Sequence, residues 1–289
     1  MEKRIGVIGG SGLYEMDGLT VLDEIRLETP FGDPSDAFLI GEIDQRPVAF
    51  LSRHGRGHRF NPSNVPYRAN VYGFRLLGVR NLFSVSAVGS LRESIEPLQF
   101  VVPDQFVDRT RNRPATFFDE GVVAHVALGD PVCARLTDLL VTAAETIGVA
   151  VHRGGTYICI EGPQFSTRAE SNLYRSWGMD VIGMTNVTEA KLAREAGLGY
   201  ATLAMVCDYD CWHDGHADVT AEIAIANLRM SVGNAQRVLR EAIGNLPTDA
   251  PSSCGGAIAN AVMTSPDNFP AGVRRRLALL LDADVGEKN

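Results

Sequence analysis

The feature that most restricts the fold of this chain is an alternation of short, β-rich apolar runs with segments of helical length. The apolar runs lie at residues 4–10, 37–43, 47–55, 81–91, 100–107, 156–162, 180–185 and 200–210. Patterns of helical length fall between several of them, at residues 134–149, 168–178 and 187–197. Alternating strands and helices are typical of an α/β domain whose sheet is covered by helices on both faces. We therefore predict a single α/β domain.

One compositional break divides the chain. The segment NLPTDAPSSCGGAI, residues 245–258, is rich in Pro, Ser and Gly, as expected of a connection between packed parts. We assign residues 1–250 to the main domain and residues 251–289 to a C-terminal tail. The sequence GVRRRLALLLDAD in this tail predicts a helix that packs on the same domain or covers it as a lid.

Composition argues against several classes of partner. The formal charge of −8 comes from 35 acidic and 27 basic residues, without a block of Lys and Arg that would follow a nucleic acid backbone. The N-terminal sequence has no apolar stretch of signal-peptide length, and no run of 18 apolar residues occurs. Five scattered cysteines favour neither a disulfide framework nor a structural zinc site. We expect a cytoplasmic protein with no nucleic acid or membrane partner.

Ligands of open α/β sheets bind beyond the carboxyl ends of the strands, so the strand exits are the places to look for a site. The first exit, GGSGL, offers glycine N–H groups and the Ser11 hydroxyl, a combination that suits a phosphate or a plain tight turn. The second exit, SRHGRGHR, places Arg53 and His54 after an apolar strand. This is either a solvated basic loop or a site for a dianionic oxyanion.

Two further exits carry small or mixed polar groups. The run SAVGSL offers the hydroxyl of Ser86 and the free N–H group of Ala87, again as an anion site or as a tight turn into a helix. The run IEGPQFSTR places Phe165 and Ser166 where an aromatic ring can stack on a flat ligand. In the same run, Glu161 either faces a ligand or pairs with Arg168.

The last exit, CDYDCW, contains two carboxylates two residues apart. If the strand persists, Asp208 and Asp210 point to the same side. A metal site there lacks a third ligand close by in the sequence, so metal binding is the weaker reading. A 6-amino purine fits better, because one carboxylate accepts from the exocyclic amine while the other, protonated, donates to a ring nitrogen.

Together, IGGSGL, TPFGDPSD, SRHGRGH, SAVGSLRE, IEGPQFSTRAES, MTNVTEAKLAREAG and CDYDCW resemble the S-methyl-5'-thioadenosine phosphorylases, within the trimeric purine nucleoside phosphorylase family. The resemblance runs from Ile5 to about Trp212. It implies a mixed central β-sheet flanked by helices, a homotrimer, and reversible cleavage of a nucleoside by inorganic phosphate. It also implies no metal and no organic cofactor. Inorganic phosphate is a co-substrate of the reaction.

Carried over by motif, the resemblance also implies residue roles. It gives a phosphate site at Ser11, Arg53, His54, Ser86, Ala87 and Thr185. It places Met184 along the ribose, Phe165 and Ser166 beside the base, and Asp208 and Asp210 at the N6/N7 edge of the purine. His125 matches a histidine that a neighbouring subunit contributes over the 5' group.

The leaving adenine needs a proton at N7, and we assign the general acid to Asp208, with a pKa raised by burial and by Asp210. Where the methylthio-specific relatives place valines against the 5' substituent, this chain has Ala221 and Ala224, which implies a roomier pocket. The tail beyond Pro251 has no visible counterpart among the motifs. We expect methylthioadenosine as the best substrate, with adenosine or another 5'-modified deoxyadenosine as the near alternative and a 6-oxopurine nucleoside as a more distant one.

Overall fold

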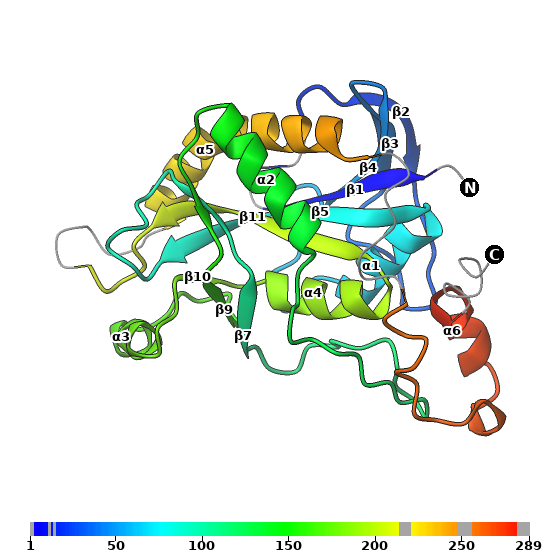
Figure 1. Cartoon of the computed structure of the whole chain (residues 1–289). Coiled ribbons are helices and arrows are strands. Elements are labelled where there is room, and N and C mark those ends of the chain that lie inside the picture. Colours follow the sequence, from blue (N-terminus) through cyan, green and yellow to red (C-terminus); the bar gives the residue numbers. More distant parts are fainter. Residues whose placement is uncertain (1–2, 11–12, 14–15, 214–220, 248–255, 282–289) are drawn as a thin grey trace.

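The structure, a computed structural model, describes residues 3–10, 13, 16–213, 221–247 and 256–281. At its centre is a mixed β-sheet of 11 strands (Figure 1). The strands are β1 (Arg4–Gly9), β2 (Thr20–Ile25), β3 (Phe38–Ile43), β4 (Arg46–Ser52), β5 (Val79–Ser90), β6 (Phe100–Val102), β7 (Gln105–Arg109), β8 (Val151–Arg153), β9 (Thr156–Ile160), β10 (Val181–Gly183) and β11 (Gly199–Asp208). The order β2-β3-β4-β1-β5-β10-β9-β7 forms one path, from which β11, β6 and β8 branch at β5.

The long strand β5 joins the two parts of the sheet. Its first half pairs in parallel with β1, and most of its length pairs in parallel with β11. Its last residues pair with β10 in antiparallel fashion. The ends of β5, β10 and β11 therefore meet at one place, where the loops that follow them converge.

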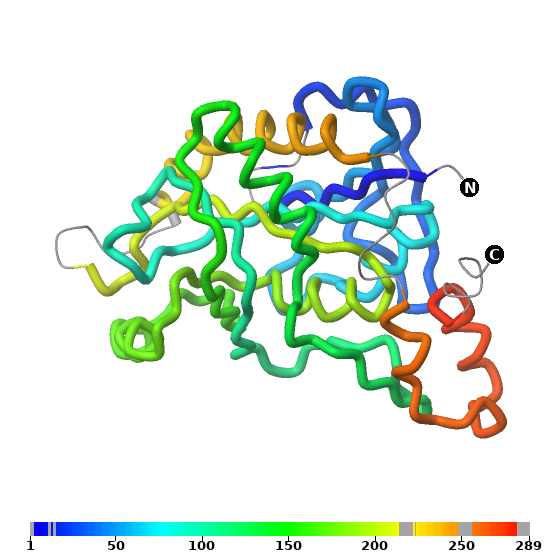
Figure 2. The backbone as a smooth tube through the Cα atoms, in the orientation of Figure 1, coloured from blue at the N-terminus to red at the C-terminus, as the bar shows by residue number. Residues whose placement is uncertain are grey.

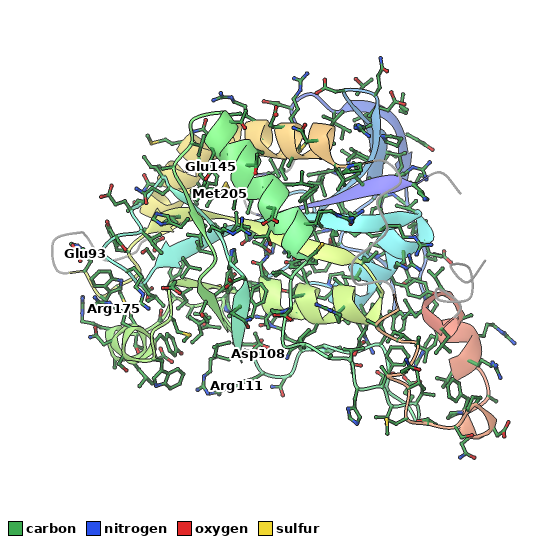
Figure 3. All side chains as sticks on the ribbon, viewed as in Figure 1. Glu93, Asp108, Arg111, Glu145, Arg175 and Met205 are labelled. Atoms are coloured by element: carbon green, nitrogen blue, oxygen red, sulfur yellow. The ribbon has the colours of Figure 1, made fainter. Side chains whose placement is uncertain are left out.

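Successive residues of the central strands point to opposite faces, and each face packs against its own helices. Val7 and Phe83 face a core formed with α2 (Ala134–Thr146) and α5 (Ala221–Asn245). Ile8 and Leu82 face a core formed with α1 (Tyr67–Leu76) and α4 (Asn186–Glu195). Met205 belongs to the first core and is labelled in Figure 3. A period of two in strands that are buried on both sides produces this double covering, and the predicted α/β class is confirmed.

Helix α3 (Arg168–Ser176) lies apart from these layers at one end of the molecule (Figure 1). It begins with a capping box, in which the Thr167 hydroxyl accepts from the Glu170 N–H group and the Glu170 carboxylate accepts from the Thr167 N–H group. Such a cap satisfies N–H groups that the first turn leaves open. It also fixes the end of the loop at residues 161–166.

Several elements differ from the sequence prediction. The run at residues 100–107 forms two strands, β6 and β7, because Pro103 has no N–H group to continue a ladder. Strand β2 was not predicted, since it lies at the sheet edge and is almost wholly exposed, so that its residues do not alternate between apolar and polar. The mixed character of the sheet, which the family resemblance implied, is confirmed by antiparallel β3, β6 and β10 pairings among parallel ones.

The C-terminal tail forms a short 3₁₀ turn (Pro266–Asn268) and the predicted helix, α6 (Val273–Leu281). Leu277 and Leu280 are buried in the same core as Phe117 and Phe118. The tail also pairs with the segment that carries His125, through the hydrogen bond from the His125 N–H group to the Ala261 carbonyl at 2.8 Å. Figure 2 shows these two segments running side by side.

None of the helices within the described residues combines the length and the apolar character needed to cross a membrane.

The assignment of the tail to the main domain can be tested through Leu277, which is 0% exposed. Leu277→Ala should lower the free energy of unfolding by about 2–5 kcal/mol, as expected when a buried leucine is truncated. If the tail shares the core, thermal unfolding should remain a single transition at a lower melting temperature. Arg275→Ala, at an exposed position of the same helix, is the control. An unchanged main transition beside a new early one would identify the tail as an independent unit.

Candidate active site

Five strand exits and the start of α5 converge on a cavity of about 750 Å³. Eleven of the residues predicted from sequence border it: Arg53, His54, Ser86, Ala87, Phe165, Ser166, Met184, Thr185, Asp208, Asp210 and Ala224. Ser11 lies outside the described residues, and so does the side chain of Ala221. His125 is exposed, on the segment paired with the tail, and is not among the described residues that border the cavity.

Arg53 follows β4 and is buried, with a side chain 1% exposed. Its guanidinium binds both carboxylate oxygens of Glu189, a residue in the first turn of α4; the Nη2–Oε2 distance is 3.1 Å. It also donates to the Val85 carbonyl at 3.0 Å and to the Ser84 hydroxyl at 2.7 Å. Most of the N–H groups of Arg53 are therefore directed at the protein, and its charge is balanced by Glu189.

Glu189 in turn accepts from the Tyr200 hydroxyl at 2.9 Å and from the Ser84 hydroxyl at 3.0 Å. It is 0% exposed, and burial of such a carboxylate is tolerated only with a full set of partners. The ion pair of Arg53 and Glu189 thus connects β4, β5 and α4 beneath the cavity. Sequence analysis missed Glu189, although a charged residue on the buried face of a predicted helix was an available signal.

The imidazole of His54 has a defined proton arrangement. Its Nδ1 lies 2.8 Å from the Phe60 carbonyl oxygen, which only accepts hydrogen bonds, so Nδ1 carries the proton. Burial, and then the neighbouring Arg53 charge, lower the pKa of His54 to about 3. The ring is therefore neutral at physiological pH, and it stacks on His58, which also borders the cavity, at 4.4 Å between ring centroids.

The same end of the cavity as Arg53 and His54 is also bordered by Ser86, Ala87 and Thr185. Thr185 is the residue that precedes the first turn of α4, so the N-terminus of that helix lies at the cavity wall. N–H groups at a helix N-terminus favour an anion. The Ser86 hydroxyl is buried and has no hydrogen-bond partner in the described part of the chain. This end of the cavity is suited to an oxyanion.

The two carboxylates of CDYDCW border the cavity together, but not because the strand persists. The pairing of β11 with β5 shifts between Val206 and Asp208, so Cys207 and Asp208 both reach the cavity. Asp210 then adopts a φ of 53°, and its N–H group donates to Asp208 Oδ1 at 2.8 Å. A side chain at Gly89 would collide with the Asp208 carboxylate, so the glycine makes room for the pair.

The environments of the two acids differ. Burial is the largest cause that raises the pKa of Asp208, to about 7; the hydrogen bond from the Asp210 N–H group opposes the rise, and the charge of Asp210 adds to it. Burial also raises the pKa of Asp210, but two hydroxyls, of Ser171 and then of Ser166, oppose the rise, and Ser166 donates to both carboxylate oxygens at 2.8 and 3.1 Å. A hydrogen bond from a donor favours the ionised form. Asp208 is thus the better candidate for the protonated partner.

The remaining predicted groups complete the wall. Phe165, at the entrance, is 47% exposed and so can present its ring to a ligand. Met184 is held through its carbonyl oxygen, which accepts from the buried Arg113 at 2.5 Å. Glu161 does not pair with Arg168, and it is not among the described residues that border the cavity. It pairs with Arg113 and accepts from Ser63, whereas Arg168 donates to the Cys211 carbonyl.

The cysteines around the acids have a packing role. Cys207 and Cys211 are free, and burial raises the pKa of the Cys207 thiol to about 12, which leaves it protonated and unreactive. In the described residues no three His, Cys, Asp or Glu side chains gather as a metal-binding group.

Comparison with known proteins agrees with this geometry. A family model described as the phosphorylase superfamily matches residues 4–244. The S-methyl-5'-thioadenosine phosphorylase of Koribacter versatilis is 54% identical over 288 residues, which cover 100% of this chain and 99% of that protein. The corresponding enzyme of Chloroflexus aurantiacus is 58% identical over 275 residues, covering 95% and 96%.

A solved methylthioadenosine phosphorylase from an Antarctic soil metagenomic library superimposes with a TM-score of 0.91 at 49% identity, covering 97% of this chain and 100% of that one. The alignment with the Koribacter protein extends over the whole chain, so it includes the tail, for which the sequence motifs gave no visible match. The chain belongs to the phosphorylase superfamily and, within it, to the S-methyl-5'-thioadenosine phosphorylase family.

Proposed function

We propose that this chain catalyses the phosphate-dependent cleavage of S-methyl-5'-thioadenosine to adenine and 5-methylthioribose 1-phosphate. The family supports this reaction, and one observation carries it: a single cavity has an oxyanion-suited end and a carboxyl pair suited to a 6-amino purine. Phosphate and the nucleoside are the two substrates, and the reaction needs no metal or organic cofactor.

The phosphate lies, in this proposal, among Ser11, Arg53, His54, Ser86, Ala87 and Thr185. Since Glu189 balances Arg53 and His54 is neutral, the anion is held mainly by oriented O–H and N–H groups and by the N-terminus of α4. Arg53 acts chiefly by fixing the shape of this end. Such rigid donors hold phosphate in line with C1'.

At the other end, protonated Asp208 donates to N7 of adenine, and ionised Asp210 accepts from the exocyclic amine. The glycosidic bond breaks first, its electron pair passes to the purine, and the proton of Asp208 neutralises the leaving group. The ribose then carries positive charge at C1', which the phosphate dianion stabilises before its oxygen bonds to that carbon.

Met184 contacts the ribose, Phe165 and Ser166 lie beside the base, and the 5' group extends toward Ala221 and Ala224 on α5. We further propose a homotrimer in which His125 of one copy covers the 5' group bound by its neighbour. The exposure of His125 and its separation from the cavity of its own chain support this arrangement.

The decisive test is adenine release from methylthioadenosine with and without phosphate. We expect release that rises with phosphate concentration to a plateau, accompanied by 5-methylthioribose 1-phosphate as product. Release at the same rate in phosphate-free buffer would identify a hydrolase that uses water. Binding without release would identify a nucleoside sensor.

The raised pKa of Asp208 predicts a pH dependence of stability as well as of rate. The unfolded chain releases this proton near pH 4 and the folded chain near pH 7, so the folded state binds the extra proton between these values. Stability due to this group therefore falls as pH rises through that window, by up to about 4 kcal/mol.

Asp208→Asn removes this penalty. We expect the variant to melt at a higher temperature than the natural protein at pH 8, and this difference in melting temperature to be smaller at pH 4.5. The turnover of the variant should fall at least about a hundredfold. In the natural protein, kcat should decline above about pH 7 as Asp208 ionises. Melting curves with the same gap at both pH values would contradict the assignment of the proton to Asp208.

Ala224 gives a test of the 5' group. We expect kcat/KM to be highest for methylthioadenosine, lower for adenosine, and still appreciable for a 5'-butylthio analogue, because alanine leaves space beside the 5' substituent. Ala224→Val should lower kcat/KM for the butylthio analogue about tenfold and leave methylthioadenosine within about threefold, consistent with one or two methyl groups of lost space. Ala226→Val, an exposed position of the same helix, is the control. A natural preference for adenosine would contradict the methylthio assignment.

A further inference from the structure

Arg113 is a buried charged residue that the proposed reaction does not use. It lies in the connection between β7 and α2, and its side chain is 1% exposed. Arg113 is not among the described residues that border the cavity, but it donates to the carbonyl of Met184, which does border it, at 2.5 Å. A buried guanidinium requires hydrogen-bond partners, so these partners show which parts of the protein it holds together.

The partners of Arg113 are mainly backbone carbonyls at the ends of two adjacent strands. Its Nη2 donates to the Glu161 carbonyl at 2.5 Å and to the Ile160 carbonyl at 3.4 Å, at the end of β9. Met184 directly follows β10, which pairs with β9. The Glu161 carboxylate, 3.3 Å from Nε, balances the charge. One planar group thus fixes the distance between the two strand ends.

The Met184 side chain rests on the backbone that Arg113 holds. A Cβ atom at Gly162 would lie 2.5 Å from the Met184 sulfur. Gly162 also has a φ of 66°, which disfavours any other residue there. The thioether therefore packs against bare backbone directly after Glu161. The hydrogen bonds from Arg113 to the Glu161 and Met184 carbonyls fix both the thioether and the surface beneath it.

The base end of the same loop is attached separately. Ser166 donates to the Asp210 carboxylate at 2.8 Å, and its own carbonyl accepts from the Cys211 thiol at 3.3 Å. These bonds join the loop to the CDYDCW turn and do not involve Arg113. The groups beside the base therefore depend on that turn for their position.

The oxyanion end also has its own attachment. Asn186 follows Thr185, is buried, and donates through its side-chain amide to the Tyr200 hydroxyl at 2.8 Å. The Tyr200 hydroxyl is bound in turn to Glu189, in the buried ion pair. The start of α4 is therefore fixed from the side of β11. The wall between the two ends of the cavity is the part that depends on Arg113.

Building on the proposed function, in which Met184 contacts the ribose, we propose that Arg113 is a positioning residue for the ribose. It holds the Met184 thioether and the Gly162 backbone where they meet the sugar, and it touches no substrate itself. Base, ribose and phosphate are then positioned by three separate sets of hydrogen bonds.

Arg113→Met tests this role, because it removes the donors and keeps much of the volume. The dissociation constants of methylthioadenosine and of 5-methylthioribose 1-phosphate should rise about tenfold, the effect of roughly one hydrogen bond. The Kd of adenine and the KM for phosphate should stay within about twofold. Isothermal titration calorimetry measures the three dissociation constants. A general loss of structure would weaken adenine as well, so equal weakening of adenine and methylthioadenosine would overturn the proposal.

Arg46→Met is the matched control. Arg46 also donates to a backbone carbonyl, that of Gly244 at 2.9 Å, but it lies at the end of β4 away from the cavity. This variant should leave all three dissociation constants within about twofold of the natural values.

A double-variant cycle tests whether Arg113 acts through Met184. Met184→Ala should weaken methylthioadenosine binding by itself. Adding Arg113→Met should then weaken it by no more than about twofold, because the side chain that Arg113 positions is already absent. Effects of the two changes that simply multiply would contradict this route.

Arg113→Lys covers the case in which Arg113→Met folds poorly, since lysine keeps a positive charge opposite Glu161. A single ammonium group lacks the planar fork that binds carbonyls at both strand ends. We expect the Kd of methylthioadenosine to rise about as much as in Arg113→Met, with adenine again within about twofold. Natural affinity for methylthioadenosine in this variant would show that charge alone suffices, against the proposal.

The two proposals can fail separately. If adenine release does not depend on phosphate in the natural protein, the proposed function fails. If release does depend on phosphate and both variants of Arg113 bind methylthioadenosine as the natural protein does, only the role of Arg113 fails.

Discussion

The buried ion pair of Arg53 and Glu189 is the interaction on which the geometry of the cavity depends. Either charge alone would be strongly unfavourable inside the protein, so each residue requires the other. Through Val85, Ser84 and Tyr200 the pair holds β4, β5, α4 and β11 in one arrangement. The positions of Ser86 and Thr185, on β5 and at the start of α4, follow from that arrangement.

The same pair has an electrostatic consequence for the reaction we propose. Because Arg53 is balanced by Glu189 and His54 is neutral, neither of these two residues adds net positive charge to the oxyanion end; Arg59, whose guanidinium donates to the Ser35 carbonyl, also borders the cavity. A strongly cationic site would hold phosphate tightly but would also reduce its attraction to the positive ribose. Fixed dipoles and hydroxyls bind the dianion while leaving its charge available to the transition state, which is where binding energy accelerates a reaction.

Much of the fold and of the candidate site could be predicted from the sequence, for identifiable reasons. Arg53, His54, Ser86 and Asp208 were found because strand exits converge in an α/β sheet, and the alternation of the strands predicted where the exits lie. Glu189 and Gly89 were not found, because their importance depends on contacts between segments far apart in the chain. The proximity of the two acids was predicted for the wrong reason, since a shifted pairing at Cys207 and the backbone of Asp210 produce it, not a continuing strand. Arg113, the partner of Glu161, was missed because it lies 48 residues away in the chain.

In the function we propose, the residues that carry the chemistry are distinct from those that contact the 5' group. Helix α5 is attached to the base end through Asn227, whose amide donates to the Cys207 carbonyl at 2.7 Å and so holds the shifted residue that precedes Asp208. Ala224, one turn earlier, borders the cavity and makes no hydrogen bond with its methyl group. Because the anchoring residue and the cavity residue are distinct, the size of the side chain at position 224 can change while Asp208 stays in place. A family that keeps one reaction can thus vary the substituent it accepts by exchanging small apolar residues on this helix.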